Sequence, residues 1–173
     1  MTDEELMVCV RDGDIGQLGA LFRRYHDKLF DYFLRMTHDR SLSSDLVQNV
    51  FERALKGRHT YKVAYPFVGW IFRIAKNILM DHYRLNKMKM TTLDGFEKLV
   101  DYSDPKVEQT DMERALNYLK PESKEVLLLT RYEDLKYREV AKIIGISETG
   151  VKSRVHRALK ELKEAYLKVV AIS

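Results

Sequence analysis

The sequence has a single cysteine, no long apolar run and no alternating strand pattern before residue 100, and each absence excludes a class of protein. With only Cys9, neither an internal disulfide nor a cysteine-based zinc site can form. No apolar stretch approaches the roughly 20 residues that a membrane-spanning helix requires. The first ten residues, MTDEELMVCV, are acidic where a signal peptide would be basic. We therefore expect a cytoplasmic protein without membrane insertion.

Charge is unevenly distributed along the chain. Residues 53–90 carry 9 Lys or Arg and 1 acid, and residues 140–173 carry 7 against 3. Residues 1–52 and 91–139 are net acidic, at 6 against 10 and 8 against 12. A protein that holds a polyanion at two places, and keeps its other surfaces away from it, is expected to show such basic islands.

Helical periodicity predicts a helix-turn-helix between Tyr137 and Leu162. A short helix over residues 137–144 ends at Gly145, which supplies left-handed backbone geometry, and Ser147 can cap the next helix. The expected buried face of that second helix is Val151, Val155, Leu159, Leu162 and Tyr166. Its outer face suits the base edges and phosphates of a major groove and consists of Thr149, Lys152, Ser153, Arg154, His156, Arg157 and Lys160. An ordinary helical hairpin with a solvated basic face is the alternative reading.

Three helices are predicted in the first 56 residues. A capping box of Thr2 and Glu5 begins the first, and a longer one follows over residues 15–36. Ser43 or Ser44 is expected to cap the third. The buried side of this third helix would be Leu46, Val47, Val50, Phe51 and Ala54, and its polar stripe would be Asp45, Gln48, Asn49 and Glu52. The spacing of the stripe suits either a basic protein surface or water, and by itself favours water.

The segment 56–66 is rich in cations, and Tyr61 and Tyr65 lie among them. Pro66 begins a fourth helix with a core face of Ile71, Ile74, Ala75, Ile78 and Leu79. Cations interleaved with aromatic rings are typical of surfaces that bind single strands. The candidates for this surface are Arg58, Tyr61, Lys62, Tyr65, Trp70, Arg73, Lys76, Asn77 and Arg84. A core position is the alternative for Trp70.

Residues 88–107 lose the helical period and gain Thr, Asp, Gly, Ser and Pro. The sequence therefore predicts an all-α fold of two small helical domains, residues 1–90 and 110–173, with a flexible linker over 91–109. The second domain would be the helix-turn-helix.

Together these pieces resemble the bacterial extracytoplasmic-function (ECF) sigma factors, the two-domain initiation factors of RNA polymerase in the sigma-70 family. The segments that carry the resemblance follow the family's order and spacing: LFRRYHDKLFDYFLRMTHD, DLVQNVFERAL, WIFRIAKNILMDHYR and YREVAKIIGISETGVKSRVHRALKEL. The resemblance implies a factor without catalysis, cofactor or metal of its own. Its implied partners are RNA polymerase core, promoter DNA and an anti-sigma factor.

The resemblance also implies roles for residues. Asp45, Gln48, Asn49, Phe51 and Glu52 would bind the clamp helices of the largest polymerase subunit, which reverses the preference for water. The second domain would meet the flap of the second-largest subunit. The loop 57–66 and Asn77 would capture a flipped base of the minus-ten element, and the outer face of the recognition helix, with Lys152, Ser153, Arg154 and Arg157, would read the minus-thirty-five element.

Two positions depart from the family pattern. The chain reads Thr149-Gly150 where members usually have Gly-Thr, and Asn49 replaces an acid that many members carry.

Two other classes of function agree less well with the sequence. A helix-turn-helix activator with an N-terminal sensing module would need strands there, and no strand pattern precedes residue 100. A nuclease would need paired carboxylates near its histidines, whereas the 5 histidines lie in different segments without them.

Overall fold

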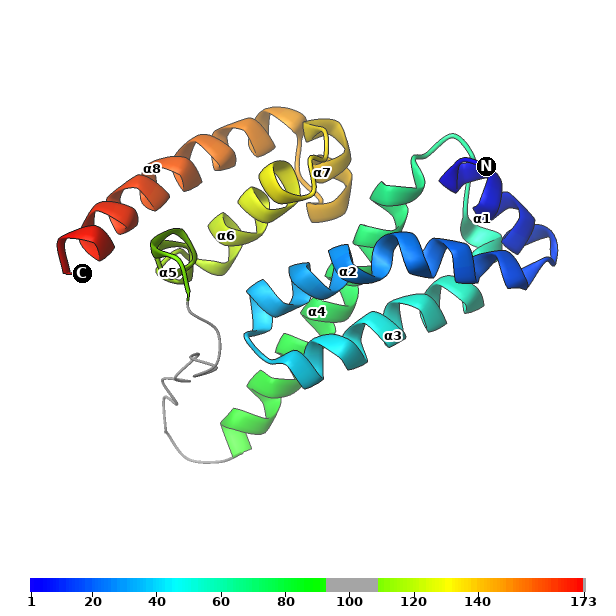
Figure 1. Ribbon diagram of the computed structural model, residues 1–173, viewed down its shortest axis with the longest axis horizontal. Coiled ribbons are helices and arrows are strands. Elements are labelled where there is room, and N and C mark those ends of the chain that lie inside the picture. Colours follow the sequence, from blue (N-terminus) through cyan, green and yellow to red (C-terminus); the bar gives the residue numbers. More distant parts are fainter. Residues whose placement is uncertain (93–108, 173) are drawn as a thin grey trace. The chain divides into compact units, whose positions relative to one another are not determined.

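The computed structural model describes residues 1–92 and 109–172, and every regular element in these ranges is helical, which confirms the predicted all-α class (Figure 1). The chain divides into two compact units, Met1–Tyr102 and Ser103–Ser173. Most of the predicted linker lies outside the described residues. The expected loss of helical structure from residue 88 is wrong, because the fourth helix continues to Thr92 and so includes the first two residues of the predicted linker. No helix within the described ranges has the length and apolarity needed to cross a membrane.

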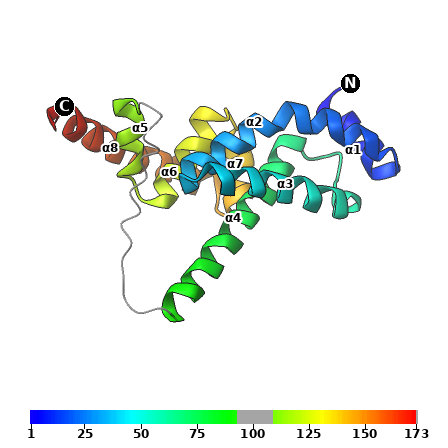
Figure 2. The same cartoon turned by 60° about the horizontal axis from the view of Figure 1, so that its bottom comes forward.

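Within residues 1–92, the first unit contains four α-helices and two short 3-10 turns. Their bounds are α1 Asp3–Asp12, η1 Ile15–Gln17, α2 Leu18–Thr37, α3 Arg40–Lys56, η2 Arg58–Thr60 and α4 Phe67–Thr92. Helix α3 runs back along α2 and also packs on α4, while α1 contacts α2, α4 and η2 (Figure 1). The end of α4 projects beyond α2 and α3 (Figure 2). This arrangement leaves one side of α3 and one side of α4 uncovered.

Capping residues set where these helices begin. The capping box of Thr2 and Glu5 is present, with the Thr2 Oγ1 accepting from the Glu5 N–H at 3.1 Å. The prediction that Ser43 or Ser44 caps α3 is wrong, because Asp39 does so by accepting from the Leu42 N–H at 2.9 Å. Ser43 is buried inside the helix and donates to the Asp39 carbonyl at 2.6 Å. Because the Ser43 hydroxyl is already bonded to a carbonyl of the preceding turn, it does not act as the N-cap.

The core of the first unit agrees closely with the periodicity. All five apolar positions predicted for α3 are buried. On α4, Ile71, Ala75, Ile78 and Leu79 are buried and Ile74 is half-buried. The rings of Tyr32, Phe33, Phe67 and Phe72 complete the interior. Cys9 is half-buried on α1.

The second unit is organised along one long helix. Its elements are α5 Asp111–Asn117, α6 Pro121–Leu127, the π-helical turn η3 Leu128–Tyr132, α7 Tyr137–Ile144 and α8 Glu148–Ile172. Helices α5, α6 and α7 all pack against α8. The predicted bounds of α7 are confirmed, including its end at Gly145, where φ is +74°.

The predicted buried face of α8 is partly wrong. Leu159 and Tyr166 remain 39% and 37% exposed. The buried positions are Val151, Val155, Ala158, Ala165 and Val169, with Leu162 half-buried. Their spacing alternates between four and three residues, a period of 3.5 that keeps one seam facing neighbouring helices. Alanines in that seam allow α5 and α6 to approach closely, so the large side chains beside them lie at its edge.

Candidate nucleic-acid and protein interfaces

The polar stripe of α3 is exposed. Asp45, Gln48, Asn49 and Glu52 all face away from the core. Phe51 does not belong to this surface, because it is only 7% exposed and its ring lies 4.8 Å from that of Phe22. Its side chain therefore anchors the helix, while the acids and amides remain available for contact.

An aromatic row on α2 borders this stripe and was missed by the sequence interpretation. The rings of Phe22 and His26 are 5.0 Å apart, and His26 stacks nearly parallel on Phe30 at 6.2 Å. The guanidinium of Arg40 on α3 lies over the Phe30 ring at 5.5 Å. The spacing of four residues between the rings was the available signal, since it places all three on one side of a helix.

The segment between α3 and α4 contains buried residues that support the loop and exposed residues that are available to a ligand. Tyr61 is 2% exposed, so its predicted role in base stacking is wrong. Its hydroxyl donates to the Tyr65 carbonyl at 3.0 Å, and its ring meets Trp70 edge-on at 5.3 Å. Burial raises the pKa of Tyr61 to about 12, and the negative charges of Glu4 and Asp3 add to the shift. Tyr61 is thus a neutral internal support of the loop.

Arg58 and Trp70 also belong to the supporting group. Arg58 donates from Nη1 to the Leu55 carbonyl at 2.9 Å, close to the end of α3, where a cation is favourable for the helix dipole. Its Nε is buried without a hydrogen-bond partner. Trp70 is half-buried, with its ring 6.0 Å from that of Phe67. Neither side chain projects freely from the surface.

The exposed members of the predicted surface are Lys62, Tyr65, Arg73, Asn77 and Arg84, and Lys76 is half-buried. Tyr65 is 44% exposed beside the start of α4. Arg73, Asn77 and Arg84 recur at intervals of four and seven residues, which keeps them on one side of the helix. Cations, one amide and one exposed ring are thereby brought together along α4 and the loop before it, a combination suited to a single strand.

A contact from α1 fixes the beginning of α4. The backbone N–H of Phe67 donates to Glu4 Oε1 at 2.9 Å. Asp3, the preceding residue, accepts from the Tyr25 hydroxyl and pairs with Arg24, both on α2. Burial and the bond to Asp3 raise the pKa of Tyr25. No local pattern could have revealed the contact between Glu4 and Phe67, since 63 residues separate them.

The helix-turn-helix has the expected turn. The Gly145 N–H donates to the Ala141 carbonyl at 2.9 Å, and Ser147 Oγ accepts from the Gly150 N–H at 3.0 Å, which confirms the predicted cap. A Cβ at residue 150 would lie 3.1 Å from Ser147 Oγ. Glycine at this position therefore fits closely beneath the capping hydroxyl, which gives the unusual order Thr149-Gly150 a local structural reason.

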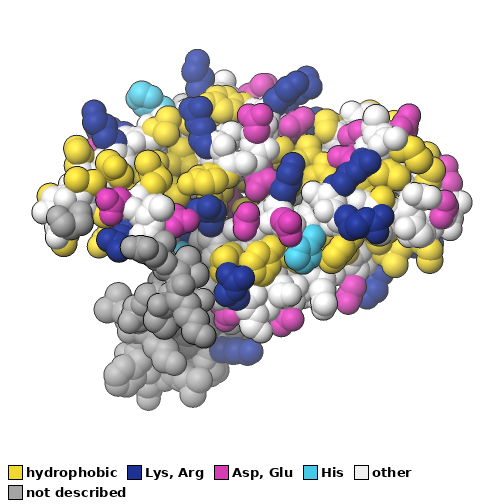
Figure 3. Space-filling view, in the orientation of Figure 1, with side chains coloured by type: hydrophobic (Ala, Val, Ile, Leu, Met, Phe, Trp, Pro, Cys, Tyr) yellow, Lys and Arg dark blue, Asp and Glu magenta, His cyan; other side chains and the backbone are white. Residues whose placement is uncertain are grey.

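The outer face of α8 is available to a ligand. Thr149, Lys152, Ser153, His156, Arg157 and Lys160 are exposed, and Arg154 is half-buried. Figure 3 shows Lys and Arg side chains gathered along the outer edge of α8. These donors occupy the first half of the helix, as a major-groove recognition helix requires.

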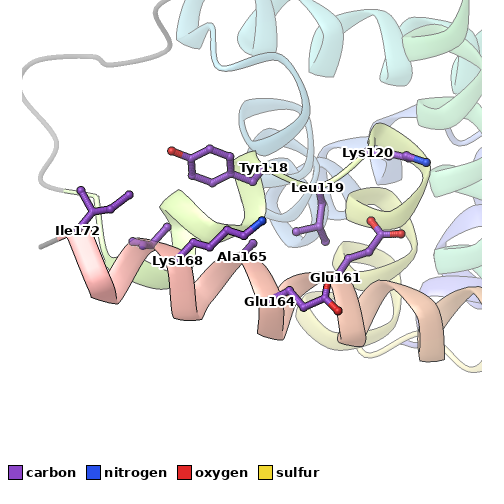
Figure 4. Close-up of a pocket in the computed structure, with 9 residues that line it drawn as sticks. Tyr118, Leu119, Lys120, Glu161, Glu164, Ala165, Lys168 and Ile172 are labelled. Atoms are coloured by element: carbon purple, nitrogen blue, oxygen red, sulfur yellow. The ribbon is translucent and has the colours of Figure 1, made fainter.

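A hollow of about 490 Å³ lies between the end of α5 and the C-terminal half of α8 (Figure 4). Its lining includes Tyr118, Leu119 and Val169, together with Lys120 and Lys168 against Glu161 and Glu164. The opposite charges balance, so the hollow does not select a ligand by charge. Within residues 1–92 and 109–172, no three His, Cys, Asp or Glu side chains are grouped to hold a metal ion.

Comparison with known families assigns both units. Residues 21–88 match the family described as Sigma-70 region 2, and residues 109–162 match Sigma-70, region 4. The ECF RNA polymerase sigma factor SigM of Bacillus subtilis (strain 168) is 30% identical over 155 residues, covering 86% of this chain and 94% of that protein. The RNA polymerase sigma factor YlaC of the same organism is 28% identical over 153 residues, covering 83% and 88%.

Two solved structures share the fold. The sigma factor RpoE in complex with the anti-sigma factor NepR, from Bartonella quintana, aligns with a TM-score of 0.74 at 23% identity, covering 87% of this chain and 96% of that one. CnrH in complex with the cytosolic domain of CnrY aligns with a TM-score of 0.72, also at 23% identity, covering 94% and 95%.

Proposed function

Since the chain belongs to the ECF sigma factors, it directs RNA polymerase core to promoters, and we propose how its two units divide that work. The observation that carries the proposal is the separation of three exposed polar faces onto three helices, α3, α4 and α8. One helix can meet a protein while the other two meet DNA. A helix-turn-helix activator with a sensing module is not favoured, because residues 21–88 match region 2.

Residues 1–90 form the unit that binds polymerase and the melted promoter. The stripe of Asp45, Gln48, Asn49 and Glu52 on α3 binds the clamp helices of the largest subunit. Acids and amides suit a basic protein surface, and the buried Phe51 holds the stripe in place. Residues 91–109, the expected linker, connect this unit to residues 110–173.

The minus-ten element is held on α4 and the loop before it. Tyr65 stacks on an unpaired base, Asn77 reads a base edge, and Lys62, Arg73 and Arg84 neutralise phosphates. Extruding a base costs a few kcal/mol, which these contacts must offset. The loop can hold a base only if it is already ordered, and Tyr61 supports it from within through the bond to Tyr65.

The minus-thirty-five element is read as duplex by α8. Arg157 and Ser153 reach base edges, and Lys152 and Lys160 contact phosphates. The capped first turn of α8 presents these side chains at the end of the helix that enters the groove.

The partners are RNA polymerase core, promoter DNA and an anti-sigma factor, with the flap of the second-largest subunit contacting residues 110–173. The two structural neighbours were both solved with a bound partner, an anti-sigma factor in the case of RpoE. Polymerase supplies the catalysis and its metal, so the chain itself acts as a specificity factor rather than an enzyme. Its place of action is the cytoplasm, with the polymerase.

Run-off transcription on genomic DNA tests this function. Core polymerase with the purified chain is expected to start at a defined set of sites that share two upstream elements, and core alone is not. Start sites that are the same with and without the chain would overturn it.

A further inference from the structure

We propose that Glu4 is a positioning residue for promoter opening, because its carboxylate holds the junction between the base-capturing loop 57–66 and α4. This inference rests on the proposed function of that loop. Glu4 lies on α1, so this helix would contribute to promoter opening although it precedes the segment matched to region 2 at residues 21–88.

The bond from Glu4 satisfies a group that the helix itself cannot satisfy. The first N–H groups of an α-helix have no intrahelical partner. Phe67 is the first residue of α4, and its N–H donates to Glu4 Oε1 at 2.9 Å. A carboxylate at a helix N-terminus also interacts favourably with the helix dipole. Glu4 therefore caps α4 from a different helix.

Helix α1 is itself fixed, so it can act as an anchor. Asp3 is bound by the Tyr25 hydroxyl and by Arg24, and Arg24 also donates to the Met1 carbonyl at 3.2 Å. The Tyr25 ring packs edge-on against Phe67 at 5.1 Å. These contacts hold α1 on α2, and Glu4, the residue after Asp3, accepts from the Phe67 N–H.

The loop is fastened at Tyr65, which presents the exposed ring, and again two residues later. Tyr65 accepts the hydroxyl of Tyr61 through its carbonyl, while Phe67 is held by Glu4 two residues later. Pro66, between them, has a fixed φ. The Tyr65 side chain is 44% exposed, although its own carbonyl is the first of these two attachments. Ordering the loop in advance reduces the entropy lost when a base is captured.

The charge of Glu4 separates this role from a general electrostatic one. An acid near a DNA-binding loop weakens attraction to phosphates, so its removal should strengthen binding if charge alone matters. If Glu4 instead positions the loop, its removal should impair strand opening. Glu4→Gln removes the charge and keeps an acceptor oxygen, whereas Glu4→Ala removes both.

The test compares wild type, Glu4→Ala, Glu4→Gln and Asp14→Ala in full-length chains bound to core polymerase. Asp14→Ala is the matched control, because it removes one acid from the same N-terminal segment, and the Asp14 carboxylate accepts from Gln17 rather than from α4. Core binding, closed complexes at low temperature, and strand opening by permanganate reactivity are measured separately. Amide exchange of Phe67 is measured in the free chain.

Glu4→Ala is expected to bind core and closed promoter within about twofold of wild type, and to lose opening on the order of tenfold, as for a lost charge-assisted hydrogen bond. The Phe67 amide should exchange faster. Glu4→Gln should retain opening within about threefold, and Asp14→Ala should match wild type.

Normal opening by Glu4→Ala would overturn the positioning role. It would also be overturned if Glu4→Gln and Asp14→Ala both lost as much opening as Glu4→Ala. These outcomes leave the proposed function intact. If wild type itself opened no promoter with core, the function of the loop and the role built on it would both fall, whatever the exchange of Phe67.

Discussion

Arg53 on α3 donates to the carboxylate of Asp81 on α4 at 3.0 Å and joins the helix that carries the acidic stripe to the helix that carries the cationic one. Asp81 is the 1 acid within residues 53–90. Arg84 lies 3.9 Å away on its other side. Both partners in the closer pair are about half exposed, so water screens their attraction. The principal effect of Asp81 is therefore to offset positive charge on α4, the helix that we propose to bind the minus-ten element.

Replacing Asp81 with Asn should strengthen binding to DNA of any sequence. Arg84, freed of its acidic neighbour, can neutralise one more phosphate, so the slope of log affinity against log salt should become steeper by about one. Unfolding free energy should fall by less than about 1 kcal/mol. Salt-dependent binding of the isolated chain to non-promoter DNA measures the slope. Asp27→Asn, on α2, is the control and should leave it unchanged.

Reversing charge on the α3 stripe should weaken binding to core polymerase without unfolding the protein. Asp45→Arg removes an acid from the exposed side and adds a like charge toward a basic partner, and Gln48→Ala should have a smaller effect. Pull-down with core enzyme, together with thermal unfolding, checks both. Unchanged capture of the Asp45→Arg protein would return that helix face to solvent.

Tyr61 should make stability fall at alkaline pH. Its pKa is about 12 when folded and about 10 when unfolded, so above pH 10 the folded chain keeps a proton that the unfolded chain releases. The unfolding free energy contributed by Tyr61 is fully present below pH 10 and is lost as pH rises toward 12. Tyr61→Phe should cost about 0.5–1.5 kcal/mol at pH 8 through the lost hydrogen bond.

The difference between Tyr61→Phe and wild type should shrink or reverse by pH 11. Denaturant unfolding at the two pH values checks this. Tyr118→Phe is the control, because Tyr118 is 73% exposed and its replacement should leave the pH dependence as it is. A constant difference between the two proteins would contradict a buried, neutral Tyr61.

On α8, base reading and phosphate binding should separate by residue. Arg157→Ala should flatten preference at one or two bases of the minus-thirty-five element, since a bidentate Arg contact discriminates by about 1–3 kcal/mol. Lys160→Ala should weaken all sequences alike and reduce the salt slope by about one. Binding to a library of randomised upstream sites at two salt concentrations distinguishes the two. Equal effects on preference would remove Arg157 from base reading.

Substitutions within the buried seam of α8 should reduce stability more than substitutions beside it. Ala158 is fully buried, and Leu in its place should overpack the contact with neighbouring helices and cost about 1–3 kcal/mol. Leu159→Ala should cost less, because Leu159 is 39% exposed. Chemical denaturation of both variants gives the comparison. A larger loss for Leu159→Ala would restore the face expected from the sequence.

The sequence predicted what depends on neighbouring residues. The capping box at Thr2, the limits of α7 and the core side of α3 all follow from spacing within a few residues, and all are found. Predictions failed where two local signals competed or where partners were distant. Asp39 and Ser43 can both cap, and only the backbone decides between them.

The candidate site shows the same division. Tyr61 appeared to be one cation-flanked ring among others, because its partners Phe67 and Trp70 belong to the next helix. Small residues in a helical seam are similarly hard to recognise: Ala158 has little hydrophobic signal, yet the close approach of other helices depends on its size. The exposed cations of α4 and α8 were identified because burial would leave a charge without solvent.

The length of α8 bears on whether two partners can bind this helix at the same time. Its 25 residues span about 37 Å, more than one turn of duplex DNA. The donors that we propose to enter the groove occupy residues 149–160, whereas the α8 residues that line the hollow lie between 161 and 172. The two surfaces therefore follow one another along a single rigid rod. A protein bound at residues 161–172 would not overlap DNA bound at residues 149–160, so both could be bound at the same time.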